Sequence, residues 1–171
     1  SKLAENADRA SLKKLADAAE KLTDGNYTSD SIAKLNDAIS KAKDALENGD
    51  EAEIAGAYED LIDAITNLEM KGNKAALKAM LEKAAAILAD TDAYVASTID
   101  GLATVKADAQ NVFDNADAVQ SEINAAVKSL TLKIAAARLL GDVNGDGAVT
   151  TSDSVSVLAA SAELTSLDAD A

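Results

Sequence analysis

Residues 31–49 read SIAKLNDAISKAKDALENG, and this stretch shows the pattern that decides the fold. Its apolar residues recur at intervals of three and four, which places them on one face of an α-helix. These residues are Ile32, Leu35, Ala38, Ala42 and Leu46. The stretch ends at Asn48-Gly49, two residue types that commonly terminate helices. The sequence therefore predicts an amphipathic helix that ends near residue 48.

The same pattern occurs twice in the chain. The apolar positions of residues 15–46 recur in residues 81–113, at an offset of 66 before a tyrosine and 67 after it. The tyrosines themselves are Tyr27 and Tyr94. A further apolar block in the first copy recurs in the second at an offset of 69, so the second copy has short insertions in two loops. Such self-similarity indicates a tandem repeat of one helical unit.

Helix-capping residues divide the chain in the same way. Asp50 is followed three residues later by Glu53, which predicts a helix start. Ser97, followed by Asp100, predicts a similar start in the second copy. We expect an all-α protein with three helices in about residues 8–70 and three in about 74–140, each set an antiparallel bundle with short loops.

The composition supports helices and excludes several functions. The chain has no proline and only 2% aromatic residues, although 48% of its residues are hydrophobic, so Ala and Leu dominate its apolar content. A net charge of −14 repels nucleic acids and anionic membrane surfaces. The sequence contains no His or Cys, the commonest catalytic bases and nucleophiles, and we expect no enzymatic activity. No signal peptide is visible near residue 1, and the chain reads as an excised fragment.

Residues 142–153 read DVNGDGAVTTSD and match the spacing of a calcium-binding loop. Calcium takes six to eight oxygen ligands, and such a loop supplies them from positions one, three, five, seven, nine and twelve. Gly147 falls at position six, where the chain must turn sharply. The ligands that we predict are Asp142, Asn144, Asp146, Ala148 through its backbone carbonyl, Thr150 and Asp153. Position twelve is usually Glu, and the shorter Asp draws the following helix nearer to the ion.

Two simpler interpretations of this loop remain open. Gly, Asn and Asp are ordinary turn formers, so the segment could be a solvated acidic turn after a helix. Alternatively, the loop binds calcium as a purely structural clip and has no protein partner.

Residues 141–153 with the apolar run of 154–164 resemble the first half of a dockerin, the calcium-loaded module that attaches secreted bacterial enzymes to cohesin domains. The resemblance implies cohesin contacts at Thr151 and Ser152. Dockerins carry two such loops, so a second would begin at Asp168 or Asp170 and the module would be truncated. We expect calcium affinity in the weak extracellular range of roughly 10⁻⁴–10⁻³ M.

In the first copy Asn26-Tyr27-Thr28 is followed by Ser31-Ile32, whereas the second copy has Val95 after its tyrosine. On these residues the helical copies resemble the FIVAR family of three-helix modules. Neither copy has the tryptophan that often follows the serine in this family. Tandem FIVAR-like modules before a dockerin-like unit resemble the C-terminal ends of large secreted carbohydrate-active enzymes, and this resemblance implies an extracellular location.

We therefore expect FIVAR-like bundles in residues 1–72 and 73–140 and a partial dockerin-like unit in residues 141–171. The expected function is that of a non-catalytic helical spacer that docks onto a cohesin when calcium is bound. The alternative is that the bundles bind host or plant glycans, such as mucins, and target the parent enzyme, with the calcium loop purely structural. Tyr27 and Tyr94 are the aromatic candidates for such a site, but packing with the hydroxyl at the rim is the favoured explanation of their position.

Overall fold

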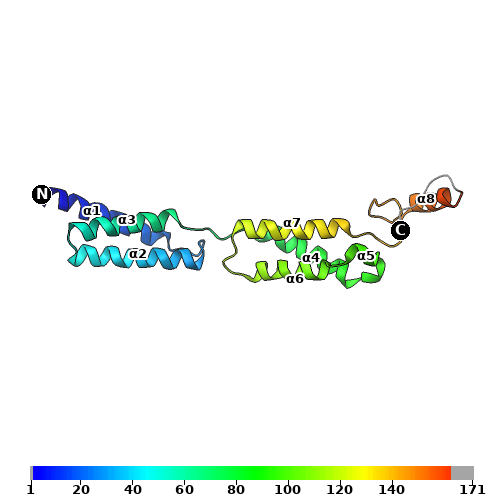
Figure 1. The fold of residues 1–171 in the computed structure, drawn as a ribbon, viewed down its shortest axis with the longest axis horizontal. Helices are drawn as coiled ribbons and strands as arrows, with labels where there is room; N and C mark the ends of the chain where they lie inside the picture. Colours follow the sequence, from blue (N-terminus) through cyan, green and yellow to red (C-terminus); the bar gives the residue numbers. More distant parts are fainter. Residues whose placement is uncertain (1, 163–171) are drawn as a thin grey trace. The chain divides into compact units, whose positions relative to one another are not determined.

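The computed structural model describes residues 2–162 and is all-α, as the sequence predicts. Its elements are α1 (Lys2–Ala19), η1 (Glu20–Leu22), α2 (Ser29–Asn48), α3 (Glu51–Thr66), α4 (Ala75–Ala89), η2 (Thr91–Ala93), α5 (Ala96–Ile99), α6 (Leu102–Asp114), α7 (Gln120–Ala136) and α8 (Thr151–Ser161) (Figure 1). Extended pairing within residues 2–162 is limited to isolated β-bridges. None of the helices in this part of the chain is both long and apolar enough to cross a bilayer.

The chain forms two compact units, and the first division between them in the sequence falls between Gly72 and Asn73. Unit 1 holds α1, α2 and α3 together with the segment Ala116–Gln120. Unit 2 holds α4 to α6, α7 from Ser121 onward, and α8. The loop and helix after residue 140 group with the second bundle, so a separate unit at 141–171 stays a prediction. Asp168 and Asp170, the predicted start of a second loop, lie outside the described residues.

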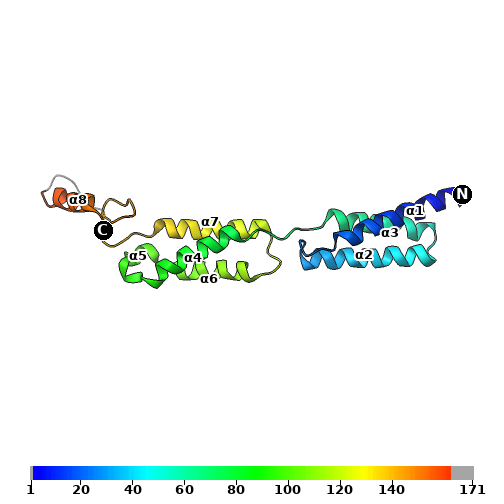
Figure 2. The same ribbon diagram turned by 180° about the vertical axis from the view of Figure 1, so that it is seen from behind.

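In unit 1, helices α1, α2 and α3 pack against one another around a small aliphatic core, and Figure 2 shows α1 lying alongside the other two. Leu12, Leu35 and Leu61 are completely buried, one from each helix. Burying such a side chain contributes about 1.5–3 kcal/mol. Most other core residues are alanines, which bury less area and let the helix backbones approach closely. The predicted helical face of residues 31–49 is therefore a core face.

Side chains stabilise several helix ends in the two bundles. Asp50 and Glu53 form the predicted capping box at the start of α3. Arg9 donates from α1 to the carbonyl of Leu46 at 2.8 Å, near the end of α2. Lys74, beside the start of α4, donates equivalently to the carbonyl of Phe113 at 2.6 Å, near the end of α6. A cation placed on these carbonyls offsets the negative end of the helix dipole.

The second copy departs from the prediction at its middle helix. We expected one helix there, but α5 ends at Ile99 and α6 begins at Leu102. Gly101 separates them with a φ of 72°, which is left-handed and favours glycine. Ser97 lies inside α5, whose N-cap is Val95, so the predicted Ser97 cap is wrong.

Each copy closes with the same short backbone pairing around its tyrosine. Tyr27 forms a bridge with Met70, and Tyr94 forms the equivalent bridge with Leu139. Beside the first bridge the Thr28 N–H donates to the carbonyl of Glu69 at 2.8 Å. Beside the second bridge the Val95 N–H donates to the carbonyl of Arg138 at 2.9 Å. The two tyrosines are 67 residues apart and their two bridge partners are 69 residues apart. These are the same offsets that separate the repeated sequence blocks. The sequence repeat is thus a structural repeat.

Segment 116–120 is held to unit 1 by backbone and side-chain bonds. Gly72 donates to the carbonyl of Ala118 at 2.8 Å, and the Lys71 ammonium lies 3.3 Å from Asp117. A hydrogen bond from the Ser29 side chain lowers the pKa of Asp117 below its ordinary value of 3.8, and Lys71 lowers it further. Because the folded pKa is depressed, this carboxylate stabilises the fold above about pH 3.8, and its contribution is lost as the pH falls through the folded pKa.

We therefore predict that Asp117 titrates below 3.8 in the folded chain. Carboxyl ¹³C chemical shifts followed against pH measure this pKa directly. The Ser29→Ala variant should raise it, because its largest stabilising hydrogen bond is removed. An Asp117 that titrates at its ordinary value in the native chain, or is unaffected by Ser29→Ala, would contradict the assignment.

Candidate metal centre

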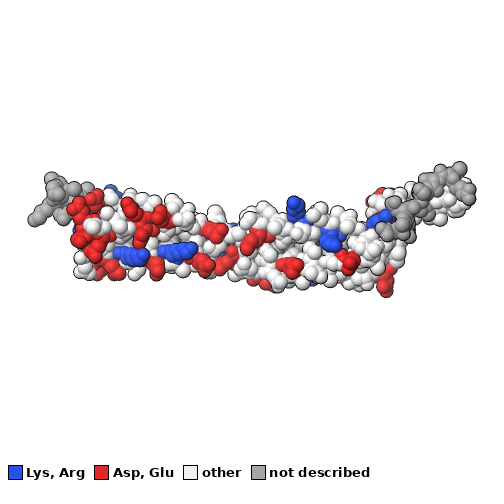
Figure 3. Space-filling model, viewed as in Figure 1, with Lys and Arg blue, Asp and Glu red and all other residues white. Residues whose placement is uncertain are grey.

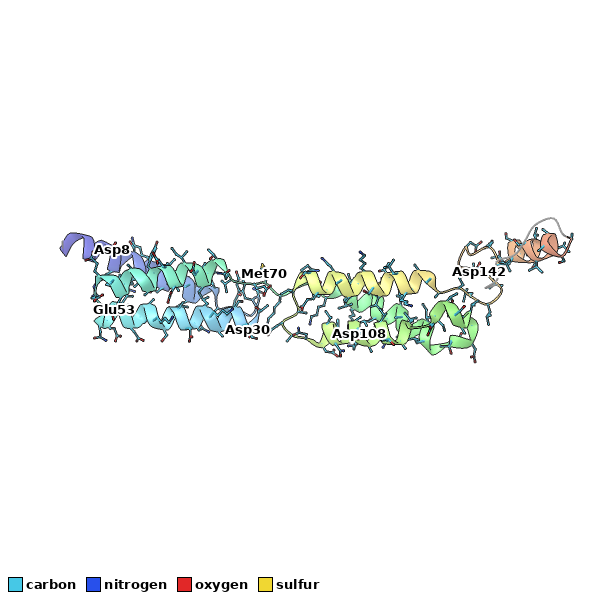
Figure 4. The ribbon with its side chains drawn as sticks, viewed as in Figure 1. Asp8, Asp30, Glu53, Met70, Asp108 and Asp142 are labelled. Atoms are coloured by element: carbon cyan, nitrogen blue, oxygen red, sulfur yellow. The ribbon has the colours of Figure 1, made fainter. Side chains whose placement is uncertain are left out.

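The predicted ligands lie together in one loop between α7 and α8, and Figure 4 labels Asp142 at its start. The backbone turns at Gly145 and Gly147, whose φ values are 72° and 88°. These left-handed conformations are strained for any residue with a Cβ atom. The glycine at position six therefore has the role that the sequence assigns to it.

Asp142 is the buried centre of this loop. Its side chain is only 2% exposed. One carboxylate oxygen accepts the N–H of Gly145 at 2.8 Å and of Asp146 at 3.1 Å, and the other accepts the N–H of Gly147 at 2.9 Å. Burial of a charged group is tolerated only where hydrogen bonds replace water, and these three provide that replacement. The loop is thus wrapped around its first residue.

Asp153 joins the two ends of the loop. It is also 2% exposed, and its Oδ1 accepts the N–H of Val143 at 2.9 Å and of Asn144 at 3.3 Å. Its Oδ2 accepts the N–H of Thr150 at 2.7 Å. The bond from Thr150 has the largest effect in lowering the pKa of Asp153, followed by those from Asn144 and Val143. This carboxyl group is therefore held in its charged form, which is the form that binds a cation.

Asn144 and Asp146 hold each other at the exposed side of the loop. The side-chain Oδ1 of Asn144 accepts the Asp146 N–H at 2.9 Å, and its Nδ2 donates to Asp146 Oδ2 at 2.9 Å. Asp146 Oδ1 also accepts the N–H of Ala148 at 3.0 Å. Both side chains are exposed to water. Their oxygens lie on the loop surface, at the predicted ligand positions three and five.

Thr150 has a second role that the loop pattern does not include. It is the N-cap of α8, where its hydroxyl oxygen accepts the N–H of Ser152 at 3.2 Å. Together with Asp153 it forms a capping box, so Asp153 belongs both to the loop and to the first helical turn. Thr151 and Ser152, the predicted partner contacts, are exposed on that turn.

Arg138 is a functional candidate that the sequence did not indicate. Its guanidinium donates from Nη2 to the carbonyls of Asp142 at 3.0 Å and Val143 at 3.3 Å. Its own backbone carbonyl accepts the N–H of Val95, so the residue ties the loop to the second helical bundle. The positive charge also offsets the repulsion among the loop carboxylates. No sequence pattern predicts that a single arginine after a helix contacts the loop that follows it.

The predicted ligand atoms are of the type that a hard cation binds. In this structure the carboxylates of Asp142 and Asp153 accept hydrogen bonds from backbone N–H groups. Within residues 2–162, no group of three or more His, Cys, Asp or Glu side chains is gathered as a metal cluster. The predicted site does not require such a group, because Asn144, Thr150 and a main-chain carbonyl supply part of it. An ionised carboxylate has about four lone-pair positions, more than the three that Asp142 uses here. All the donors are oxygens, which favours calcium over zinc or copper.

Comparison of the chain with protein-family models, with curated proteins and with solved structures finds no match.

Proposed function

We propose that this chain is a non-catalytic region of a secreted bacterial enzyme, in which helical bundles act as a spacer and the calcium loop with α8 docks onto a cohesin-type domain. The proposal rests on the resemblance of residues 141–164 to a dockerin and on the local geometry described above. No catalytic residue is assigned, because the sequence has neither His nor Cys.

The observation that carries the proposal is the uncovered apolar surface of α8. Val155 is 64% exposed and Leu158 70%, and Asp153 is the only residue of this helix that is buried. Leu158 lies three residues after Val155, so the two side chains share one face of the helix. A surface of this kind, next to polar loop residues, is typical of a protein-interaction site. A cohesin-type domain is the occupant that the dockerin resemblance implies.

The loop and the helix are coupled through Asp153. Bound calcium would neutralise the charges of Asp142, Asp146 and Asp153, whose mutual repulsion otherwise favours an open loop. Asp153 accepts N–H groups from both ends of the loop while it caps α8. A closed loop therefore fixes the first turn of α8, with Thr151 and Ser152 and the apolar face behind them. Docking would then depend on calcium.

The helical units suit a spacer better than a glycan site. The face of unit 1 in Figure 3 carries many carboxylates among a few basic side chains. An open groove of about 700 Å³ beside α2 and α3 is lined mostly by charged and polar residues, with two alanines and one leucine and without an aromatic ring. Tyr27 and Tyr94 are half-buried in the paired segments that close each copy. Sugar sites usually present exposed aromatic rings, and this groove has none, although Tyr58 elsewhere on α3 is 37% exposed.

The test is retention of the chain on immobilised cohesin domains, in calcium and in chelator. We expect retention in calcium only. The Leu158→Asp variant should lose retention while its calcium uptake is unchanged, because it places a charge in the apolar docking face. Met70→Asp is the matched control, since Met70 is 64% exposed but lies in unit 1. Wild-type failure on every cohesin tested, or full retention of Leu158→Asp, would overturn the proposal.

A further inference from the structure

Two Asn-Gly pairs occur in the chain, and they lie in different structural settings. Asn144-Gly145 occupies positions three and four of the candidate calcium loop, exposed to water. Asn48 is the last residue of α2, and Gly49 follows it as the C-cap. Asparagine is chemically labile, and a following glycine has no side chain to obstruct attack by its own backbone nitrogen.

The reaction in question is deamidation. The backbone nitrogen of the glycine bonds to Cγ of the asparagine, loses its proton, and the amide nitrogen leaves as ammonia. The resulting five-membered imide is then opened by water at either carbonyl. One product is aspartate, and the other is isoaspartate, in which the main chain runs through the side-chain carbon. Water is the only co-reactant.

Both reacting groups of Asn144-Gly145 are restrained in the closed loop. The Gly145 N–H, which must be freed to attack, donates to Asp142 Oδ1 at 2.8 Å. The Asn144 amide is held at both ends by Asp146, through bonds of 2.9 Å. Opening of the loop would break these restraints while leaving the pair in water.

We propose that Asn144 is a spontaneous deamidation site whose rate is set by closure of the loop. The restraint by Asp142 comes from the structure, whereas the protection by calcium and the loss of docking rest on the proposed function. The isoaspartate product adds a methylene to the main chain between positions three and four. Gly145 and Gly147 are then displaced relative to Asp142. The backbone N–H groups that its carboxylate accepts can therefore not all form their hydrogen bonds again. The modification would end calcium-dependent docking irreversibly.

Asn48-Gly49 provides an internal reference in the same molecule. The Gly49 N–H bonds to the carbonyl of Ala45 at 2.9 Å, continuing the helical hydrogen-bond pattern. The carbonyl of Gly49 also accepts a bond from Arg9. A helical backbone held at both of these points keeps the Gly49 nitrogen away from the Asn48 side chain. We expect this pair to react more slowly than Asn144-Gly145.

The experiment incubates the full chain at mildly alkaline pH, in calcium and in chelator, and follows both pairs by peptide mapping with chromatographic separation of Asp and isoAsp. In chelator we expect Asn144 to convert several-fold faster than Asn48. Asp142→Ala should accelerate conversion at Asn144 further, because it frees the Gly145 N–H. Asn144→Gln should remove the product peptides.

The outcomes separate this inference from the proposed function. Equal or slower conversion at Asn144 than at Asn48, or no acceleration in Asp142→Ala, would overturn the deamidation site. If both expectations hold and calcium also slows the reaction, both proposals are supported. If both hold but calcium leaves the rate unchanged, the deamidation site stands and the proposed calcium dependence fails.

Discussion

Asp142→Ala is expected to abolish calcium uptake by the chain. Asp142 is the first predicted ligand and the buried acceptor for three backbone N–H groups, so the substitution removes both a ligand and the centre of the loop. Isothermal titration of the wild-type chain should give a Kd in the range of about 10⁻⁴–10⁻³ M. The variant should show no uptake at millimolar calcium.

Asp92→Ala is the matched control for this prediction. Asp92 is an exposed carboxylate of the same helical unit, in η2 and outside the loop, and its loss changes the net charge equally. This control should bind calcium like the wild-type chain. If Asp142→Ala and Asp92→Ala bound calcium equally well, uptake would come from general surface charge and not from the loop.

Leu61→Ala should strongly destabilise the first helical bundle. Leu61 is completely buried on α3, in the core shared with α1 and α2. Replacing a buried leucine by alanine costs about 2–5 kcal/mol, since it leaves a cavity that the neighbours fill only partly. Hydrogen exchange followed by mass spectrometry should show lost protection in α1, α2 and α3.

Leu132→Ala makes the same chemical change at an exposed position. Leu132 is 64% exposed on α7, so the substitution should change stability by no more than about 0.5 kcal/mol. Equal losses from Leu61→Ala and Leu132→Ala would contradict the core described here.

The regular parts of the fold could be predicted because they depend on local pattern. The spacing of Leu35, Ala38 and Ala42 identifies a buried helical face, and all three are buried. Asp50 with Glu53 identifies a helix start that the structure confirms. In each case the responsible residues lie within one or two helical turns of each other, where spacing determines which side chains meet.

The interruption at Gly101 could not be predicted in the same way. A glycine inside a helix costs only about 1 kcal/mol relative to alanine, so an apolar pattern that continues on both sides of it still favours one helix. The structure instead uses its left-handed conformation, and the Asp100 carbonyl beside it accepts a bond from Lys133 at 2.8 Å. Lys133 belongs to α7, so this contact depends on tertiary packing.

The candidate site was predictable in position but not in its surroundings. The twelve-residue spacing places the ligand positions in one loop, and Gly147 has the expected backbone conformation. The contact of Arg138 with the loop depends on where α7 ends, and the capping role of Thr150 and Asp153 depends on where α8 begins. Calcium binding itself stays a prediction.

The most direct test of the central claim is a calcium titration of the full wild-type chain followed by ¹H–¹⁵N NMR. The amides of Gly145, Gly147 and Thr150 report on the loop, because each donates to Asp142 or Asp153. We predict that these three signals shift together and saturate by millimolar calcium, while the Gly49 amide at the end of α2 does not move. Loop amides that stay unchanged at millimolar calcium would contradict the account.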